Sequence, residues 1–306
     1  MSFFVNLLKA TRPHTYPLSL VGVLVGNAIA WTQLRTQGQI TDNKFWLILS
    51  LTLLTAVSLQ ILSNLANDYG DGKRGTDAHR TDRHFGDTLS PQMLMNAIIG
   101  FVGLICVSGL TLLVLSLGIG REFWGFLGLG ACAIIAAITY TMGKNPYGYK
   151  AKGELAVFVF FGMVNVLGSS YLQSKQISGL AVLFAIIIGV LCTCVLTVNN
   201  LRDIDSDRQA GKTTLVTLLG KGKTITYYKQ ALIGAFVLLG LYAVFRQNYY
   251  FIALIVLFPL CRRHVTTLHQ YRTNALTPQI FAKQLKSIVQ LTLMTGLISS
   301  ISLILK

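Results

Sequence analysis

Long apolar runs recur along the whole chain, and they constrain the fold more than any other feature. Each run holds few or no charges and is about as long as the helix that crosses the hydrocarbon core of a bilayer, roughly 20 residues. In lipid a helix satisfies its own backbone hydrogen bonds. The composition agrees, since 53% of the residues are apolar and 12% are charged, against about 25% charged in soluble domains. The sequence therefore predicts an all-α integral membrane protein.

We place nine membrane spans in one polytopic domain that covers residues 1–306. The eighth span is the weakest, because the apolar stretch 250–260 is short and contains Pro259. The predicted spans are residues 17–34, 46–66, 95–118, 123–141, 155–172, 179–199, 229–245, 249–261 and 287–305.

The 26 Lys and Arg residues are divided unequally between the two sides of these spans. With the N-terminus placed in the cytoplasm, 20 fall on the cytoplasmic side and six on the other. Cytoplasmic loops carry an excess of Lys and Arg, so the count favours a multi-pass membrane protein with a cytoplasmic N-terminus. It also explains the net charge of +15 without nucleic acid. The cytoplasmic connections are the longer ones, which indicates that the working face is cytoplasmic.

Eight of the eleven Asp and Glu residues fall in two clusters, each directly after an apolar span on the cytoplasmic side. In each cluster an Asn and two Asp residues are spaced to share one helix face. These residues are Asn64, Asp68 and Asp71 in the first cluster, and Asn200, Asp203 and Asp207 in the second. Like charges on one face repel each other, and a divalent cation removes that repulsion. Mg²⁺ prefers one or two carboxylates together with substrate phosphates.

Basic residues adjoin both clusters and could face the phosphates themselves. They are Lys73, Arg74, Arg202, Arg208 and Lys212. A single Asp pair at a membrane edge is more simply a solvated helix end. Two such pairs, each with an Asn before it and basic residues after it, indicate the two halves of one site for Mg²⁺ and a diphosphate.

At these residues the sequence resembles the UbiA superfamily of intramembrane aromatic prenyltransferases, which a pair of Asp-rich motifs defines. The similarity runs over nearly the whole chain and is closest to the branch that prenylates 1,4-dihydroxy-2-naphthoate in menaquinone synthesis. It is carried by Arg12-Pro13 with Pro17-Leu18, Gln60–Asp71, Ala137–Thr141, Asn145–Tyr149, Val159–Gly162 and Asn199–Asp207.

The resemblance implies nine helices bundled around a central cavity that opens to the cytoplasm and to lipid. Two Mg²⁺ ions would be held by the Asp residues of the two motifs, with Asn64 and Asn200 assisting. The diphosphate of a polyprenyl donor would bridge the metals, the allylic bond would ionise, and the cation would alkylate the aromatic ring as the ring carboxylate leaves as CO₂. The expected diphosphate-binding residues are Asn64, Asn67, Lys73, Arg74, Arg83, Asn200, Arg202 and Lys212.

Aromatic and polar residues after the fourth span are further candidates. Tyr140 could stabilise the allylic cation through its ring face, or it could belong to the aromatic belt at the membrane interface. Asn145, Tyr147 and Tyr149 could bind the aromatic acceptor, or they could serve the turn in which they lie. Glu154 is explained equally by catalysis and by the favourable position of an acid at a helix N-terminus.

One loop departs from the pattern of this family, and three other functions remain open. The family is expected to have Arg-x-Gly-Pro-x-Arg after the first motif, but residues 82–91 match it only at Arg83 and Gly86. A weakened homologue is therefore one alternative. Transfer to another acceptor, such as 4-hydroxybenzoate or haem, is the second. A cation-coupled transporter is the third, although transporters place such acids near the bilayer midplane rather than at its edge.

Overall fold

The computed structural model describes residues 3–39, 43–75, 89–272 and 276–306. Within these ranges, nine helical spans are long and apolar enough to cross a membrane, as predicted. Six are single helices: α2 (Pro17–Thr36), α3 (Asn43–Arg74), α4 (Pro91–Leu117), α5 (Arg121–Thr139), α8 (Gly179–Arg202) and α12 (Pro278–Ile304). The other three spans are kinked or composite. One is α10 (Leu215–Phe245), which is kinked at Gly220. The second consists of α6 (Gly153–Val157), η3 (Phe158–Leu167) and α7 (Gly168–Ser174), and the third of η4 (Tyr249–Leu257) and α11 (Phe258–Gln270).

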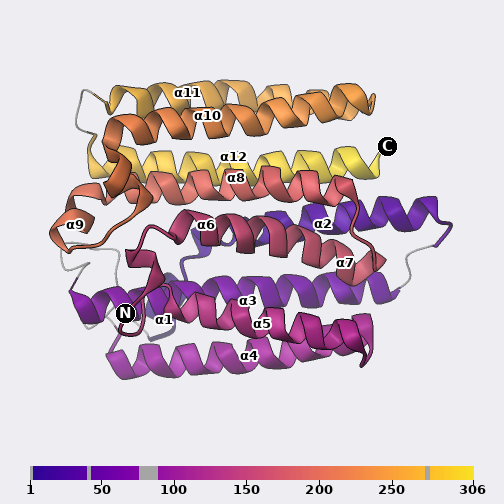
Figure 1. Ribbon diagram of the computed structural model, residues 1–306, viewed down its shortest axis with the longest axis horizontal. Coiled ribbons are helices and arrows are strands. Elements are labelled where there is room, and N and C mark those ends of the chain that lie inside the picture. Colours follow the sequence, from indigo (N-terminus) through magenta and orange to yellow (C-terminus); the bar gives the residue numbers. More distant parts are fainter. Residues whose placement is uncertain (1–2, 40–42, 76–88, 273–275) are drawn as a thin grey trace.

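The spans lie side by side along the long axis of the molecule (Figure 1). The two termini lie at opposite ends, as an odd number of spans requires. The short helix α9 (Ile204–Gln209) lies at one end, which we call the α9 end. The last turns of α3 and α8 lie at this end too, so the described residues of both Asp clusters are brought together there (Figure 1).

Several helices extend farther at the α9 end than the predicted spans. Helix α3 continues to Arg74 rather than ending at residue 66, and α10 begins at Leu215 rather than at residue 229. Gly220 interrupts α10 with a φ of 72°, a conformation that only Gly adopts without strain. Hydropathy marks the part of a helix that is apolar enough for lipid, so the polar extensions were missed.

The eighth span is longer than predicted, and Pro259 does not break it. It consists of the 3₁₀ segment η4 followed by α11, which ends at Gln270 instead of residue 261. Pro259 is in the first turn of α11, where its missing N–H would have no partner inside the helix. The Pro therefore marks the change from the 3₁₀ segment to the α-helix.

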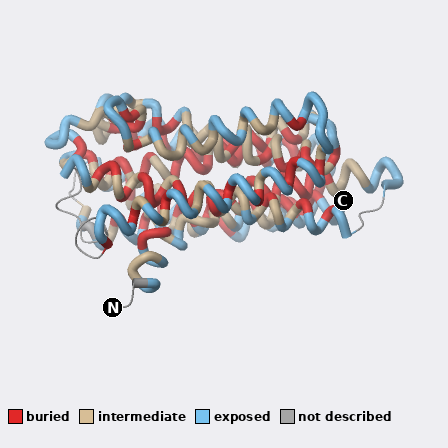
Figure 2. Tube along the Cα trace, turned by 90° about the horizontal axis from the view of Figure 1, so that it is seen from below, coloured by how far each residue is buried: buried red, intermediate tan, exposed pale blue. Residues whose placement is uncertain are grey.

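Helix α8 lies at the centre of the bundle and packs against α2, η3, α10 and α12. The contact with η3 is close, because a Cβ on Gly162 would lie 2.5 Å from the Cα of Gly189 and from the carbonyl oxygen of Ala185. Small residues allow such approach between membrane helices. Buried residues follow the inner sides of the helices and exposed ones the outer sides (Figure 2). Exposed apolar side chains such as Val107, Val237 and Val256 suit a surface that faces lipid.

Candidate functional site

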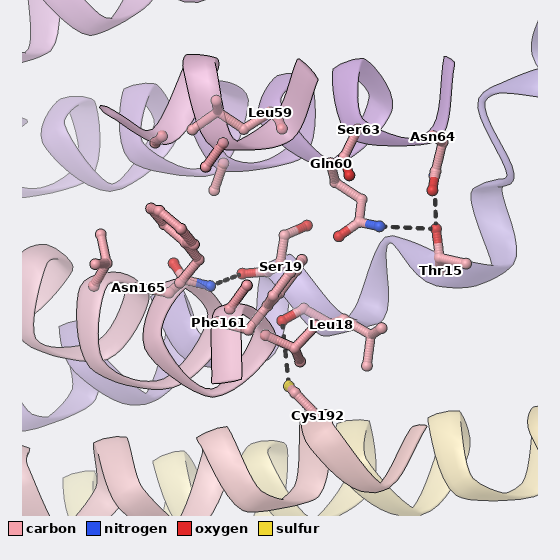
Figure 3. A pocket seen from close by; sticks show the side chains of 18 of the residues that line it. Thr15, Leu18, Ser19, Leu59, Gln60, Ser63, Asn64, Phe161, Asn165 and Cys192 are labelled. Carbon is pink, nitrogen blue, oxygen red and sulfur yellow. Dashed lines mark hydrogen bonds between the residues drawn. The ribbon is translucent and has the colours of Figure 1, made fainter. Parts of the chain in front are cut away.

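A cavity of about 380 Å³ lies inside the bundle among α2, α3, α5, η3 and α8. Its wall at the α9 end is polar and charged, and it includes Arg12, Asn64, Asn67, Asn199, Asn200, Arg202, Asp203 and Lys212. From there the cavity follows α3 as far as Thr52, about 22 Å at a helical rise of about 1.5 Å per residue. Leu59 and Gln60 of α3 face Leu18 and Phe161 across this part (Figure 3). The cavity thus has a charged head and a long, mainly apolar tail.

The first Asp cluster lies on one face of α3, as predicted. The helix continues without interruption through Asn64, Asp68 and Asp71, and all three are buried. The Asp68 carboxylate forms an ion pair with Arg12, which precedes η1 (Pro13–Thr15) and has a left-handed backbone with φ 51°. The Tyr149 hydroxyl donates a hydrogen bond of 2.8 Å to Asp71 Oδ1. Each buried carboxylate of this cluster therefore has a partner from a distant part of the chain.

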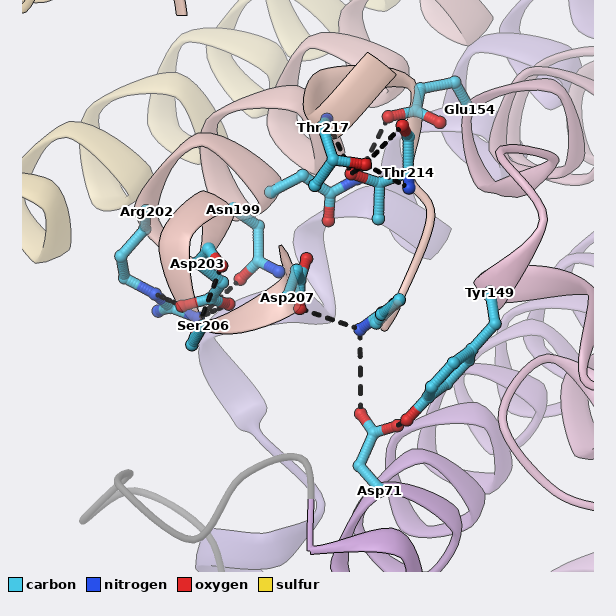
Figure 4. Close-up of polar contacts among 12 residues, drawn as sticks. Asp71, Tyr149, Glu154, Asn199, Arg202, Asp203, Ser206, Asp207, Thr214 and Thr217 are labelled. Atoms are coloured by element: carbon cyan, nitrogen blue, oxygen red, sulfur yellow. Dashed lines mark hydrogen bonds and ion pairs between the residues drawn. The ribbon is translucent and has the colours of Figure 1, made fainter. Parts of the chain in front are cut away.

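The second Asp cluster does not lie on one straight helix, so that expectation was wrong. Helix α8 ends at Arg202, and α9 begins at Ile204. At the break, both carboxylate oxygens of Asp203 accept hydrogen bonds of 2.8 Å from the adjacent Arg202. Asp207 points instead toward Lys212 and Asp71 (Figure 4). The two carboxylates of this cluster thus have separate partners.

Lys212 joins the two clusters. Its Nζ lies 3.5 Å from Asp207 Oδ1 and 3.9 Å from Asp71 Oδ2 (Figure 4). A turn presents this side chain, because Gly211 has a φ of 68° and the Lys212 N–H donates to the carbonyl of Asp207 at 2.8 Å. Burial raises the pKa of Asp207 to about 6, and the charge of Lys212 acts in the opposite direction. A single cationic side chain therefore lies between carboxylates from both motifs.

Tyr140 and Tyr147 line the cavity beside the charged head. Their rings pack edge to face with centroids 5.3 Å apart. Burial raises the pKa of Tyr147 to about 12 and raises that of Tyr140 further still. Both phenols are therefore neutral at physiological pH, and the Tyr147 hydroxyl donates to the carbonyl of Ala136 at 3.0 Å. The two rings form an aromatic wall next to the carboxylates.

Seven of the predicted site residues that the structure describes are absent from the cavity lining. Four of them contact the lining residues Arg12 or Lys212, or one another: Asp68, Asp71, Asp207 and Tyr149. The other three, Lys73, Arg74 and Asn145, are exposed. Arg74 donates instead to the carbonyl of Gly143 at 2.5 Å and lies over the ring of Tyr149, 5.3 Å from its centroid. The remaining candidate, Arg83, lies outside the described residues.

Comparison with known proteins identifies the family. The sequence profile of the UbiA prenyltransferase family matches residues 15–285. The chain belongs to this family. It is 44% identical over 245 residues to 1,4-dihydroxy-2-naphthoate octaprenyltransferase of Escherichia coli K12, covering 78% of this chain and 76% of the relative. It is 38% identical to the octaprenyltransferase of the same name from Mycobacterium leprae, with 78% and 77% covered.

Solved structures of the UbiA family have the same fold. A UbiA homologue from Archaeoglobus fulgidus, bound to GPP and Mg²⁺, superposes with a TM-score of 0.62 at 15% identity and covers 98% of this chain and 100% of that one. A homologue from Aeropyrum pernix K1, solved in the apo state, also gives 0.62 at 15% identity, with 100% and 98% covered. The all-α membrane fold predicted from the sequence is therefore confirmed, and Mg²⁺ binding occurs within the UbiA family.

Arg12 and Glu154 belong to the site of this UbiA protein, although spacing did not single them out. Arg12 is part of the site because its guanidinium forms an ion pair with Asp68. Glu154 is buried, and its Oε1 accepts a hydrogen bond of 2.9 Å from Asn200 Nδ2. In the sequence, Arg12 was indicated only by its place in a stretch shared with the UbiA superfamily. Glu154 was indicated only by its place as an acid at the start of an apolar span.

The residues at the head of the cavity fit a hard divalent cation. They supply carboxylate and amide oxygens, the donors that Mg²⁺ prefers. Among the described residues, the buried Asp207 Oδ2 and Asn67 Oδ1 have no hydrogen-bond partner, so both oxygens could serve a ligand. No group of three or more His, Cys, Asp or Glu side chains forms a metal cluster in the described ranges.

Proposed function

We propose that the protein transfers a polyprenyl group from polyprenyl diphosphate to 1,4-dihydroxy-2-naphthoate, with loss of CO₂, in menaquinone biosynthesis. The observation that carries this proposal is the single cavity whose head contains residues of both Asp clusters and whose tail is long and apolar. Such a cavity matches a donor with a charged diphosphate and a hydrocarbon chain. The acceptor is supported by the name of relatives at 44% and 38% identity, 1,4-dihydroxy-2-naphthoate octaprenyltransferase.

At the head, Asp68 and Asp71 would hold one Mg²⁺ and Asp203 and Asp207 another, with Asn64 and Asn200 assisting. When bound, Mg²⁺ would neutralise the diphosphate and so favour cleavage of the allylic C–O bond. Arg12, Arg202 and Lys212 are paired with the same carboxylates in this structure. Their charges become available to phosphate oxygens when another cation neutralises the carboxylates.

The aromatic wall would act on the organic part of the reaction. The neutral rings of Tyr140 and Tyr147 would stabilise the allylic cation through their faces. A new C–C bond would form between the first carbon of the prenyl chain and the ring carbon that bears the carboxylate. The electron pair of the bond to the carboxylate would return to the ring as CO₂ leaves.

We further propose that the α9 end faces the cytoplasm of a bacterium and that residues 1–306 act as one domain in the inner membrane. The proposal is supported by the distribution of Lys and Arg, of which 20 fall at the predicted cytoplasmic side and six at the other. In this orientation both water-soluble parts of the substrates, the diphosphate and the aromatic acid, reach the head of the cavity from the cytoplasm.

One assay tests substrate and chemistry together. The purified protein in lipid vesicles is given labelled polyprenyl diphosphate, Mg²⁺ and either carboxyl-labelled 1,4-dihydroxy-2-naphthoate or 4-hydroxybenzoate. We expect prenylated naphthoquinol and one labelled CO₂ per product. Product from 4-hydroxybenzoate alone would contradict the proposed acceptor, and prenylated naphthoate that retains its label would contradict the decarboxylation.

A further inference from the structure

The amide of Asn200 is held in one orientation by a buried acid. Asn200 and Glu154 are 4% and 6% exposed, and the Nδ2 of Asn200 donates a hydrogen bond of 2.9 Å to Glu154 Oε1. A carboxylate offers acceptors only, so the amide must turn its nitrogen toward Glu154. Because Asn200 lines the cavity, its Oδ1 is the polar atom left for a ligand there.

The Asn of the other motif is held in the same way. The Nδ2 of Asn64 donates to the carbonyl oxygen of Thr11 at 2.9 Å and to Thr15 Oγ1 at 3.0 Å. A backbone carbonyl also only accepts, so this amide too is fixed by its nitrogen and keeps its oxygen for other contacts. Asn64 also lines the cavity. In both Asp clusters an acceptor thus fixes the amide nitrogen of the Asn. The acceptor is a backbone carbonyl in the first cluster and the Glu154 side chain in the second.

The surroundings of Glu154 fix it in place. It lies in the first turn of α6, where unpaired backbone N–H groups favour an acid. The hydroxyl of Thr193 on α8 donates to the backbone carbonyl of Glu154 at 3.4 Å. Burying a carboxylate is unfavourable unless its contacts compensate, and here the helix N-terminus and the Asn200 amide supply those contacts.

We propose that Glu154 is a positioning residue: it holds the Asn200 amide so that oxygen, rather than nitrogen, faces the head of the cavity and can bind a divalent cation. The inference rests on the proposed function, because it assigns the cation to that site. An amide turned the other way would place two N–H donors beside the cation and remove a ligand oxygen. Groups behind metal ligands act in this manner in other metal sites.

A double-mutant cycle separates orientation from charge. The wild type, Glu154→Gln, Asn200→Asp and the double variant are purified in nanodiscs, and Mn²⁺ binding is measured by the EPR signal of the free ion. Gln offers both a donor and an acceptor, so Glu154→Gln leaves the Asn200 amide free to turn. Asp at position 200 has an oxygen on either side and does not need orienting.

We expect Glu154→Gln to weaken Mn²⁺ binding by about 10- to 100-fold when Asn200 is present, the usual effect of losing a group behind a metal ligand. With Asp at position 200, the same change should have a much smaller effect. Equal losses in the two backgrounds would mean that Glu154 acts through its charge alone, and that would overturn the inference. No loss in either background would overturn it as well.

Three controls separate the role of Glu154 from a general loss of charge, from misfolding and from the absence of a metal site. Glu122→Gln makes the same chemical change at the opposite end of the bundle, on an exposed side chain, and should leave Mn²⁺ binding unchanged. Glu154→Ala is taken through the same cycle, so that the outcome does not depend on the folding of one variant, and thermal unfolding is followed throughout. A wild type that binds no Mn²⁺ would contradict the proposed metal site itself, whereas failure of the cycle alone would contradict only the role of Glu154.

Discussion

Arg12 and Asp68 form an ion pair between residues 56 positions apart in the sequence. The pair joins the segment before α2 to the buried face of α3 at the head of the cavity. The Asp68 side chain is fully buried and that of Arg12 is 16% exposed. The guanidinium is thus beside the place where a diphosphate would bind, and it can serve a phosphate once the carboxylate has another cation.

We expect Arg12→Ala to raise the KM for the polyprenyl diphosphate by about 10- to 100-fold, because hydrogen bonds to charged groups contribute about 1.5–3 kcal/mol. Arg12→Lys should retain part of the affinity, since it keeps the charge and loses the fork of donors. Steady-state kinetics with varied donor measures both. Mn²⁺ binding should not weaken in Arg12→Ala, because a cation that competes for Asp68 is gone. A normal KM would remove Arg12 from the diphosphate site.

Activity should depend on a divalent cation. Without one, the carboxylates at the head of the cavity would repel the diphosphate. Product formation should therefore stop in excess EDTA and return when Mg²⁺ is added beyond the chelator. Full turnover in EDTA would rule out the proposed mechanism, and NaCl at the same ionic strength in place of Mg²⁺ is the control.

Asp68→Asn and Asp203→Asn should each abolish most of the activity. Each change removes the charge that would hold one cation, and both cations are needed at once. The double variant should be little worse than either single one, as is usual for residues that act as a unit. Product formation at matched membrane expression is the measurement. Near-normal activity of either single variant would show that its cluster is only a solvated helix end.

The stability of these two variants should differ, which the sequence alone did not suggest. Asp68→Asn leaves the guanidinium of Arg12 without its buried partner, and such a loss is strongly destabilising. The carboxylate of Asp203 is paired with an adjacent, partly exposed Arg202, so its loss should affect thermal unfolding much less. Arg12→Gln combined with Asp68→Asn should recover stability without recovering activity. Equal thermal unfolding of the two single variants would contradict the buried ion pair.

The orientation can be tested with single cysteines in a background without the native ones. A membrane-impermeant thiol reagent added to intact cells should not label Gly86→Cys or Lys223→Cys, which belong to the predicted cytoplasmic side. It should label Gly120→Cys, just before α5 at the opposite end of the bundle. The reverse pattern would invert the proposed topology.

The tail of the cavity should set which donors are accepted. Gly109 of α4 lines it, and a Cβ there would lie 3.9 Å from the nearest side-chain atom, on Thr55. Gly109→Phe should therefore fit the helix but fill the tail, so that kcat/KM falls more for long donors than for geranyl diphosphate. Gly100→Phe is the matched control, since Gly100 is exposed on the same helix and does not line the cavity. An equal loss with all donors would contradict this role of the tail.

The spans and the first Asp cluster could be predicted because each depends on neighbours along the chain. Hydropathy is a local property, and the helical period places Asp68 and Asp71 on one face once α3 continues. The partners of these residues could not be predicted, because contacts with Arg12 and Lys212 arise only when distant segments pack. The break at Asp203 and the outward turn of Arg74 toward Gly143 were missed for the same reason.

The π-helix η3 sets the rotational phase between two halves of one membrane span. On one side α6 directs Glu154 toward Asn200, and on the other α7 packs Ser169 against Gly26, where a Cβ would clash with its Oγ. Each residue of an α-helix turns the chain by about 100°, and the wider π-helix turns somewhat less per residue. Removing one residue from η3 would therefore rotate one half against the other by roughly a quarter turn. A single-residue deletion here would therefore unseat Glu154 or Ser169 while leaving the hydropathy of the span almost unchanged.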